Sequence, residues 1–571
     1  MKRLKPSGFF VLAAVAAVWS CQMPIADPPP AAPVQFGTLA IDVAGPGVYP
    51  LNMTEASHVT LNNLNNHDVY FVQLNLSSIP LEKQQALYSA SAQETAATSG
   101  AAATSAAVAT SAAPADAAAS RTTASGGDFD WERYTPYEPA ASDTPLLRSQ
   151  IRGADRPVLA RSFSAAAPQT FTPGVSTRSF WVRRKADSQW YQVAATLRIQ
   201  GSKCMVWVAD DSLEASSVSS TDNKITPAQA QALADKFDAV YDKETLLFGF
   251  EYGGGAGGNG GVDGLSEIQI LVYDIDEDAA QGDVIGYFWW KDEVSQESLN
   301  ASGRGDVKSN AAEIFYMDTY IADRYPSTAH STLIHEFQHM INYNKKTLRL
   351  DKNPASWYNE MLSMLAEDVL DEFISISMSN TGHPVLLRIT KFLQGYNKIG
   401  VGEWFSSDVQ SYANNYAFGA FLARNFGGAL LVKEMMDNDA VDKDSVTAAV
   451  NTITGGNWTF NELLEKFAET LVFTSANGSN MTFNKSVSST IGGTVFSFGA
   501  FNIATMLRPA STVLAGGTGP YYFKPDEIWS TRPNALVAVT GDTWKNINGS
   551  LTVTLNKPAE NSKSFIMVKN P

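Results

Sequence analysis

Two histidines four residues apart constrain this chain more than any other feature of its sequence. His335 and His339 lie within the segment 332–341, Thr-Leu-Ile-His-Glu-Phe-Gln-His-Met-Ile. Residues at i and i+4 project from one face of an α-helix, so the two imidazoles can chelate one metal ion. The other positions of the segment are mostly apolar. This pattern predicts a buried central helix whose polar side faces a compensating group.

Zinc is the metal that suits this pattern. It accepts imidazole and carboxylate ligands, and a catalytic zinc ion has three protein ligands and one open position. Glu336 lies between the histidines and is predicted to be the general base that activates the attacking water. The alternative is a buried helix whose histidines are only satisfied core residues. The spacing and the central glutamate favour one catalytic zinc ion.

The third zinc ligand must come from elsewhere in the chain. No His-x-x-Gly-x-x-His pattern follows the first histidine pair, which excludes the metzincin arrangement. Asn353-Pro354 is expected to open a second helix, on which Glu360 follows His339 by 21 residues. Glu360 is therefore the predicted third ligand. Glu367 lies on the same helical face and is the alternative.

The segment His-Glu-Phe-Gln-His-Met-Ile, followed at 357–368 by Trp-Tyr-Asn-Glu-Met-Leu-Ser-Met-Leu-Ala-Glu-Asp, resembles the hyicolysin family of secreted bacterial zinc metallopeptidases. The likeness covers roughly 178–475. By position, the resemblance implies that His335, His339 and Glu360 bind zinc and that Glu336 is the catalytic base. It also implies a thermolysin-like two-helix core, the fold of a glutamate-type zincin.

The groups around the zinc site are less clear from the sequence. Thermolysin-like enzymes have an aspartate one helical turn beyond the third ligand, where it orients a histidine, but this chain has Met364 there. Ser363 or Glu367 is the candidate substitute. Three further residues are candidates for stabilising the oxyanion, although a structural role is preferred for each taken alone: His383, Tyr412 and Tyr416.

Calcium is a weaker prediction than zinc. Asp274, Asp276 and Asp278 alternate like the ligands of a calcium loop, but the glycine and the terminal glutamate of an EF-hand are absent. A solvated turn is the preferred interpretation. The glycine-rich run at 253–261 lacks the Lys-Ser/Thr of a phosphate-binding loop, so we predict a mobile surface loop there.

The N-terminus predicts export and a lipid anchor. Basic residues precede the apolar run 9–18, which is too short to span a bilayer and is typical of a signal peptide. The run ends in Val-Trp-Ser-Cys, which resembles a bacterial lipobox. We therefore predict acylation of Cys21 and attachment to a membrane of the cell envelope, at the outer membrane or cell surface. The alternative is cleavage near Ser20 and release as a secreted form.

Composition divides the chain into successive units. The predicted units are a signal peptide (1–21), a Pro-rich tether (22–36), a small β module (37–83), a low-complexity linker (84–165), a zinc metallopeptidase domain (166–477) and a β-sandwich-like module (478–571). In the metallopeptidase domain, strand candidates come first and helical patterns dominate from about residue 327. This order predicts an α+β fold with a strand-rich N-terminal half and a helical C-terminal half.

These features together predict an enzyme. The chain has 58 acidic and 42 basic residues and a formal charge of −16, which argues against a nucleic-acid partner. We expect a zinc-dependent endopeptidase that hydrolyses polypeptides outside the cytoplasm. The rival is an inactive zincin-fold surface lipoprotein that only binds a partner, and the intact Glu336 argues against it. An aminopeptidase is a third hypothesis, but no motif for binding a free amine is recognisable.

Overall fold

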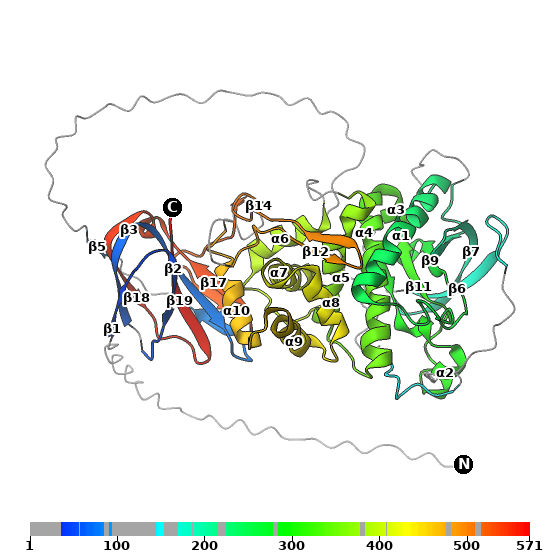
Figure 1. Cartoon of the computed structure of the whole chain (residues 1–571), viewed down its shortest axis with the longest axis horizontal. Helices are drawn as coiled ribbons and strands as arrows, with labels where there is room; N and C mark the ends of the chain where they lie inside the picture. Colours follow the sequence, from blue (N-terminus) through cyan, green and yellow to red (C-terminus); the bar gives the residue numbers. More distant parts are fainter. Residues whose placement is uncertain are drawn as a thin grey trace, which may run out of the picture.

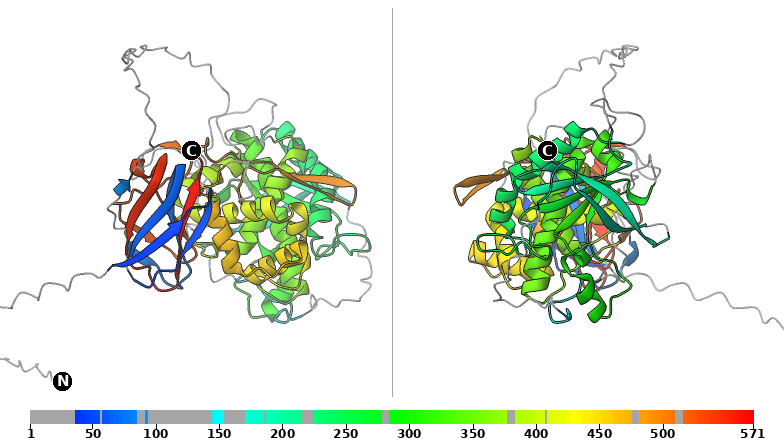
Figure 2. Two further views of the ribbon diagram at one scale, coloured as in Figure 1. Left: turned by 60° about the vertical axis from the view of Figure 1, so that its left-hand side comes forward. Right: turned by 90° about the vertical axis from the view of Figure 1, so that its right-hand side faces the viewer.

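The computed structural model describes residues 36–55, 57–84, 91–93, 144–153, 170–184, 187–214, 224–277, 284–376, 383–406, 408–474, 481–508 and 516–571. Cys21, the signal peptide and most of the predicted tether and linker lie outside these residues. The described parts form a β domain, a group of helices and a mixed sheet in succession (Figure 1). The β domain also lies at one end of the molecule when it is turned by 60° (Figure 2, left).

The mixed sheet has six strands in the order β10-β11-β9-β8-β7-β6. The strands are β6 (Thr177–Arg183), β7 (Trp190–Gln200), β8 (Cys204–Ala209), β9 (Ile268–Tyr273), β10 (Gly286–Phe288) and β11 (Ile314–Asp318). β8, β9 and β11 run parallel, whereas β6, β7 and β10 run antiparallel to their neighbours. The three parallel strands are buried along their whole length, which explains their almost continuous apolar sequences. β10 is an edge strand.

Helix α1 (Pro227–Phe248) connects β8 to β9 and packs against α4. Thr226 caps its N-terminus: its side chain accepts a hydrogen bond from the N–H of Gln229, and the Gln229 side chain accepts one from the N–H of Thr226. This capping box and the proline at the first helical position fix the start of the helix.

The second half of the predicted metallopeptidase domain is helical, which confirms the predicted α+β fold. After α2 (Gln296–Ala301), which precedes β11, the helices are α3 (Thr319–Arg324), α4 (Pro326–Asn342), α5 (Ser356–Leu370), α6 (Pro384–Gly395), α7 (Val409–Phe426), α8 (Ala429–Asp437), α9 (Asp442–Thr454) and α10 (Phe460–Glu469). Short 3₁₀ segments are η1 (Ile275–Glu277), η2 (Trp290–Glu293), η4 (Asp371–Ile374) and η5 (Asp542–Trp544), and a π-helical turn, η3 (Tyr343–Arg349), continues α4. α4 packs between α1 and α5, and α5 packs against α7.

The β domain is built from both ends of the described chain. Its sheet contains β1 (Gly37–Asp42), β2 (Gly47–Leu51), β3 (Ser57–Asn75), β5 (Ser91–Gln93), β17 (Leu536–Val539), β18 (Ile547–Leu555) and β19 (Ser562–Lys569). The first part of β3 pairs with β1 and β18, and its second part pairs with β17 and β19. The segments 37–83 and 478–571, predicted as two modules, thus share one sheet. Local alternation predicts strands but not partners almost 500 residues away.

Three smaller pairs of strands complete the structure. They are β4 (Leu81–Gln84) with β16 (Trp529–Thr531), β12 (Val487–Ile491) with β13 (Thr494–Phe498), and β14 (Leu507–Arg508) with β15 (Gly517–Thr518). The β12–β13 hairpin contacts α5 and α8. Leu146 and Ile151, from the predicted linker, are buried beside the mixed sheet. None of the helices in the described residues has the length and apolar character needed to cross a membrane.

Candidate metal centre

The two histidines lie on α4, and the packing of that helix sets their direction. Phe337 is fully buried, and its ring lies 5.1 Å from the ring of Phe237 and 5.2 Å from that of Tyr241, both on α1. This contact fixes the apolar face of α4 against α1. His335 and His339 project toward α5 and are 8% and 9% exposed. The buried central helix predicted from the sequence is therefore present.

Glu360 of α5 faces both histidines. Its Oε2 atom lies 3.1 Å from Nε2 of His335, and its Oε1 atom lies 3.5 Å from Nε2 of His339. One ligand atom from each of the three side chains lies within 4.8 Å of the other two. The structure thus brings together the three residues that the sequence predicted as metal ligands.

This donor set fits zinc, which accepts two imidazoles and a carboxylate in a catalytic site. Burial opposes protonation of His335, but the carboxylates of Glu360 and Glu367 outweigh it and raise the pKa of this imidazole to about 10. Burial likewise raises the pKa of Glu360, yet the two histidines lower it well below its ordinary value. The carboxylates of this pocket therefore stabilise positive charge next to them, as a cation site requires.

Glu336 is 5% exposed and lies on the same helix, next to the ligand set. Burial raises its pKa above the usual value, although His335 and His339 partly oppose the shift. The carboxylate also accepts a hydrogen bond from the backbone N–H of Phe288, which ends the edge strand β10. A base with a raised pKa takes up a proton near neutral pH more readily than an ordinary glutamate.

The comparisons with known proteins agree with this geometry. A family model described as peptidase M30 matches residues 190–493, more than half of the chain, and these residues include all four side chains. This chain belongs to the peptidase M30 family. The neutral metalloprotease ShpI of Staphylococcus hyicus is 28% identical over 312 residues, which make up 51% of this chain and 61% of that protein. The chain thus spans about three fifths of that relative's length. The resemblance to the hyicolysin family is confirmed.

Glu367 contacts the ring nitrogen of His335 that faces away from Glu360, and it is not one of the three residues whose ligand atoms converge. Its Oε1 atom is 2.6 Å from Nδ1 of His335 and accepts a second hydrogen bond from Arg388 at 2.8 Å. Its Oε2 atom accepts one from the hydroxyl of Ser331 at 3.0 Å. With the Nδ1 proton of His335 donated to Glu367, the lone pair of Nε2 is directed at the metal position.

Ser363 does the same for His339. Its Oγ atom lies 3.0 Å from Nδ1 of His339 and donates its own proton to the side-chain oxygen of Gln338. The Nδ1 proton of His339 can therefore be donated to Ser363, which leaves Nε2 as the ligand atom. Met364 is fully buried in the core. Glu367 and Ser363 share the orienting role that the sequence analysis left open between them.

The three residues considered for stabilising the oxyanion contact other side chains or the backbone. Nδ1 of His383 accepts a hydrogen bond from the N–H of Val385, and its Nε2 atom lies 3.2 Å from a carboxylate oxygen of Asp371. Tyr416 donates to Asp368 at 2.8 Å. The ring of Tyr412 packs edge-on against Trp404, with centroids 4.5 Å apart. These contacts support the structural role that was preferred for each residue.

Sequence reasoning missed Arg388, Asp371 and Phe288. Arg388 lies on α6, and no motif marks it among the other basic residues of the chain. The hydroxyl of Ser331 lies 2.9 Å from Asp371, so that carboxyl group joins the network behind His335. The backbone contact of Phe288 could not be read from residue type at all. The aspartate triplet tested for calcium is not complete here, because Asp278 and the side chain of Asp276 lie outside the described residues.

Proposed function

We propose that this chain is a zinc-dependent endopeptidase that hydrolyses polypeptides outside the cytoplasm. The observation that carries the proposal is the convergence of His335, His339 and Glu360 beside the buried carboxylate of Glu336. Membership of the peptidase M30 family and the printed name of the staphylococcal relative support it.

In the proposed mechanism, His335, His339 and Glu360 hold the metal. Zinc, when bound, polarises the scissile carbonyl and makes water more acidic. Glu336 accepts a proton from the attacking water and delivers it to the leaving nitrogen. Glu367 and Ser363 keep the imidazoles in the tautomer that can bind a metal, and burial excludes bulk water from the network.

The edge strand β10 supports a polypeptide as substrate. Its inner side pairs with β11, and no strand covers its outer side among the described residues. An extended peptide can add to such an edge through main-chain hydrogen bonds. Because Phe288 of β10 contacts Glu336, a peptide bound there would place its backbone next to the base. This arrangement favours an endopeptidase, since it requires no free amino terminus.

The test compares zinc content and casein hydrolysis in wild type, Glu336→Gln and Glu360→Gln. Glu336→Gln should retain zinc and lose about 10²–10⁴ in rate, because it removes the base but no ligand. Glu360→Gln should lose zinc affinity and activity together, because a neutral amide is a poorer ligand. A fully active Glu336→Gln variant would refute the mechanism.

Two rivals make different predictions in the same assay. An inactive surface-binding lipoprotein would retain little zinc and cleave neither casein nor a mixed peptide library. An aminopeptidase would release only N-terminal residues from peptides. Internal cleavage that needs zinc would exclude both.

We also propose that acylation of Cys21 attaches the enzyme to the cell envelope. The support is the charged and apolar N-terminal pattern followed by a lipobox-like sequence. Cys21→Ala should move the protein from the membrane fraction to the soluble exported fraction. Equal membrane association of the variant and the wild type would show that the anchor is elsewhere.

A further inference from the structure

A buried arginine contacts the carboxylate that orients His335. Arg388 of α6 is 7% exposed, and its Nη2 atom donates to Oε1 of Glu367 at 2.8 Å. The same oxygen lies 2.6 Å from Nδ1 of His335. Two donors from different helices therefore converge on one carboxylate oxygen. The position of this oxygen is set by Arg388 as well as by His335.

Arg388 lies on the apolar face of its helix. Val385 precedes it by three positions and Phe392 follows it by four, and both are buried. Ile389, the next residue, is also fully buried. A charged side chain on such a face is costly unless a group of opposite charge pairs with it. Glu367 is that group, so the contact between α6 and α5 is built around this ion pair.

The guanidinium group is also supported from α7. Its central carbon lies 5.9 Å from the ring centroid of Tyr416, which is within the range of a cation–π interaction. Tyr416 is fully buried, and its hydroxyl donates to Asp368 at 2.8 Å. Asp368 pairs in turn with Arg424 at 2.9 Å. The ring that supports Arg388 is therefore itself fixed, which gives the guanidinium group a defined direction toward Glu367.

The other oxygen of Glu367 has a donor that is shared. The hydroxyl of Ser331 lies 3.0 Å from Oε2 of Glu367 and 2.9 Å from a carboxylate oxygen of Asp371. A serine hydroxyl has one proton, so it cannot donate to both carboxylates at once. Arginine has five N–H donors and remains protonated in proteins. Arg388 therefore holds Glu367 even when Ser331 donates to Asp371.

We propose that Arg388 is a positioning residue of the metal centre and acts through Glu367 on His335. The inference rests on the zinc peptidase function proposed above. Arg388 keeps the carboxylate where it accepts the Nδ1 proton of His335, which leaves Nε2 of that ring for the metal. It also supplies the positive charge that offsets the buried carboxylate. Arg388 is not itself a ligand, because a protonated guanidinium group has no lone pair to give to a metal.

The test is a double-mutant cycle on zinc affinity. Metal-free wild type, Arg388→Met, Glu367→Gln and the variant with both changes compete with a chromogenic chelator for zinc. Arg388→Met should lower zinc affinity on the order of tenfold. The double variant should bind zinc as Glu367→Gln does, because Arg388 then has no carboxylate through which to act. Additive losses, or an unchanged zinc affinity in a folded Arg388→Met variant, would overturn the proposal.

Two variants keep the test decisive if Arg388→Met does not fold. That change leaves a buried carboxylate without its charged partner, whereas the double variant lacks both charges and should be more stable. Comparing the double variant with Glu367→Gln alone then decides the question. Arg388→Lys retains the charge and should recover most of the zinc affinity. A loss in Arg388→Lys as large as that in Arg388→Met would contradict the proposal. The Tm of each metal-free variant reports its folding.

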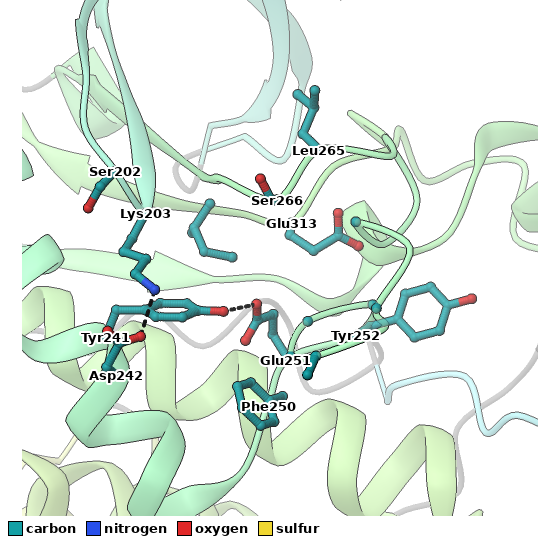
Figure 3. Close-up of a pocket in the computed structure, with 17 residues that line it drawn as sticks. Ser202, Lys203, Tyr241, Asp242, Phe250, Glu251, Tyr252, Leu265, Ser266 and Glu313 are labelled. Carbon is teal, nitrogen blue, oxygen red and sulfur yellow. Dashed lines mark hydrogen bonds and ion pairs between the residues drawn. The ribbon is translucent and has the colours of Figure 1, made fainter. Parts of the chain in front are cut away.

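Glu251→Gln is the matched control for replacing a buried carboxylate. Glu251 is 2% exposed and accepts a hydrogen bond from Tyr241 at 2.6 Å. It lines a cavity of about 400 Å³ beside the glycine-rich loop, together with Tyr241 and Glu313 (Figure 3). None of the proposed zinc ligands lines this cavity. Glu251→Gln should bind zinc like wild type. A loss equal to that of Glu367→Gln would show a general effect of buried carboxylates and would overturn the proposal.

Kinetics at saturating zinc separate positioning from substrate binding. Arg388→Lys should have the KM of wild type for casein, because Arg388 acts on the metal centre and not on the substrate. A raised KM with unchanged zinc affinity would make Arg388 a substrate-binding residue and overturn the proposal. If wild type binds zinc and cleaves casein but the cycle is additive, this inference alone fails. A wild type that binds no zinc would overturn the proposed function as well.

Discussion

His335 is held by a carboxylate on each of its ring nitrogens, Glu360 in front and Glu367 behind. Burial raises the pKa of Glu367, but Arg388 and His335 outweigh it and lower this pKa to about 2. Glu367 is therefore ionised throughout the range in which peptidases work. An ionised acceptor on Nδ1 makes the opposite nitrogen a better metal ligand.

The role of Glu367 can be separated from that of a ligand. Glu367→Gln should lower zinc affinity about 10–100-fold, because it removes the charged hydrogen-bond acceptor of His335 and not a metal ligand. Activity should return largely at excess zinc, unlike that of Glu360→Gln. Zinc affinity is measured by competition with a chromogenic chelator. Glu372→Gln, at an exposed position of η4, is the control and should match wild type. Complete loss of zinc from Glu367→Gln alone would make it the third ligand.

A buried acid predicts how stability depends on pH. Burial raises the pKa of Asp263 to about 7, with Glu267 adding to the shift and Arg178 opposing it. In the unfolded chain an aspartate has a pKa of about 3.9, so the native state binds this proton more tightly. The stabilising contribution is therefore complete below about pH 4 and is lost as pH rises through about 7. Glu293 and Glu313, whose pKa values are also raised, act in the same direction.

We expect the free energy of unfolding to fall between pH 5 and pH 8. Asp263→Asn should reduce this fall, because the amide does not titrate. Urea unfolding at the two pH values measures the effect, with the exposed Asp235→Asn as control. An identical pH dependence in Asp263→Asn and wild type would contradict the assignment.

At the scale of elements, the helix that carries the histidines depends on its packing against α1. Phe337 of α4 contacts Phe237 and Tyr241 and is fully buried. Phe337→Ala should lower the free energy of unfolding by about 3–5 kcal/mol through lost burial and a cavity. It should also weaken zinc retention, because α4 loses its anchor. Denaturant unfolding checks the first effect and metal analysis the second.

Truncating an exposed apolar side chain to alanine is the control for the Phe337 experiment. Leu430 of α8 is 45% exposed, and Leu430→Ala should change stability by less than about 0.5 kcal/mol. If Phe337→Ala changes the free energy of unfolding as little as Leu430→Ala does, the α1–α4 contact does not support the metal centre.

Elements with strong local patterns could be predicted from the sequence. The strand β8 and the start of α1 follow from local sequence, because β8 is a continuous apolar run and the cap of α1 acts within a few residues. The common helical face of His335 and His339 followed from their spacing. The role of Arg388 could not be predicted, because it depends on a contact between α6 and α5.

At the scale of the whole molecule, the β domain and the helices share one hydrophobic core. Buried residues of β3, β18 and β19 belong to the same cluster as those of α1, α4 and α5. Polar contacts cross the same boundary: the N–H of Tyr521 donates to the carbonyl of Leu393 at 3.0 Å, and Arg532 pairs with Glu403 at 2.7 Å. The two parts are therefore expected to unfold together.

Ile566 tests this coupling from the end of the molecule opposite the mixed sheet. It is fully buried on β19, where it lies opposite Phe71 of β3 and Tyr49 of β2. Ile566→Ala should cost about 2–5 kcal/mol. If the core is continuous, calorimetry should show a single transition at lower temperature, and peptidase activity should be lost across that same transition.

Ile79→Ala is the control for the Ile566 experiment, since Ile79 belongs to the same domain but is 65% exposed. It should change the free energy of unfolding by less than about 0.5 kcal/mol. Two separate transitions in Ile566→Ala, with activity following only the upper one, would show that the β domain folds independently. A shared transition would instead mean that strands from both ends of the described chain stabilise the metal centre between them, because opening the sheet at β19 would then expose the core that supports α4 and α5.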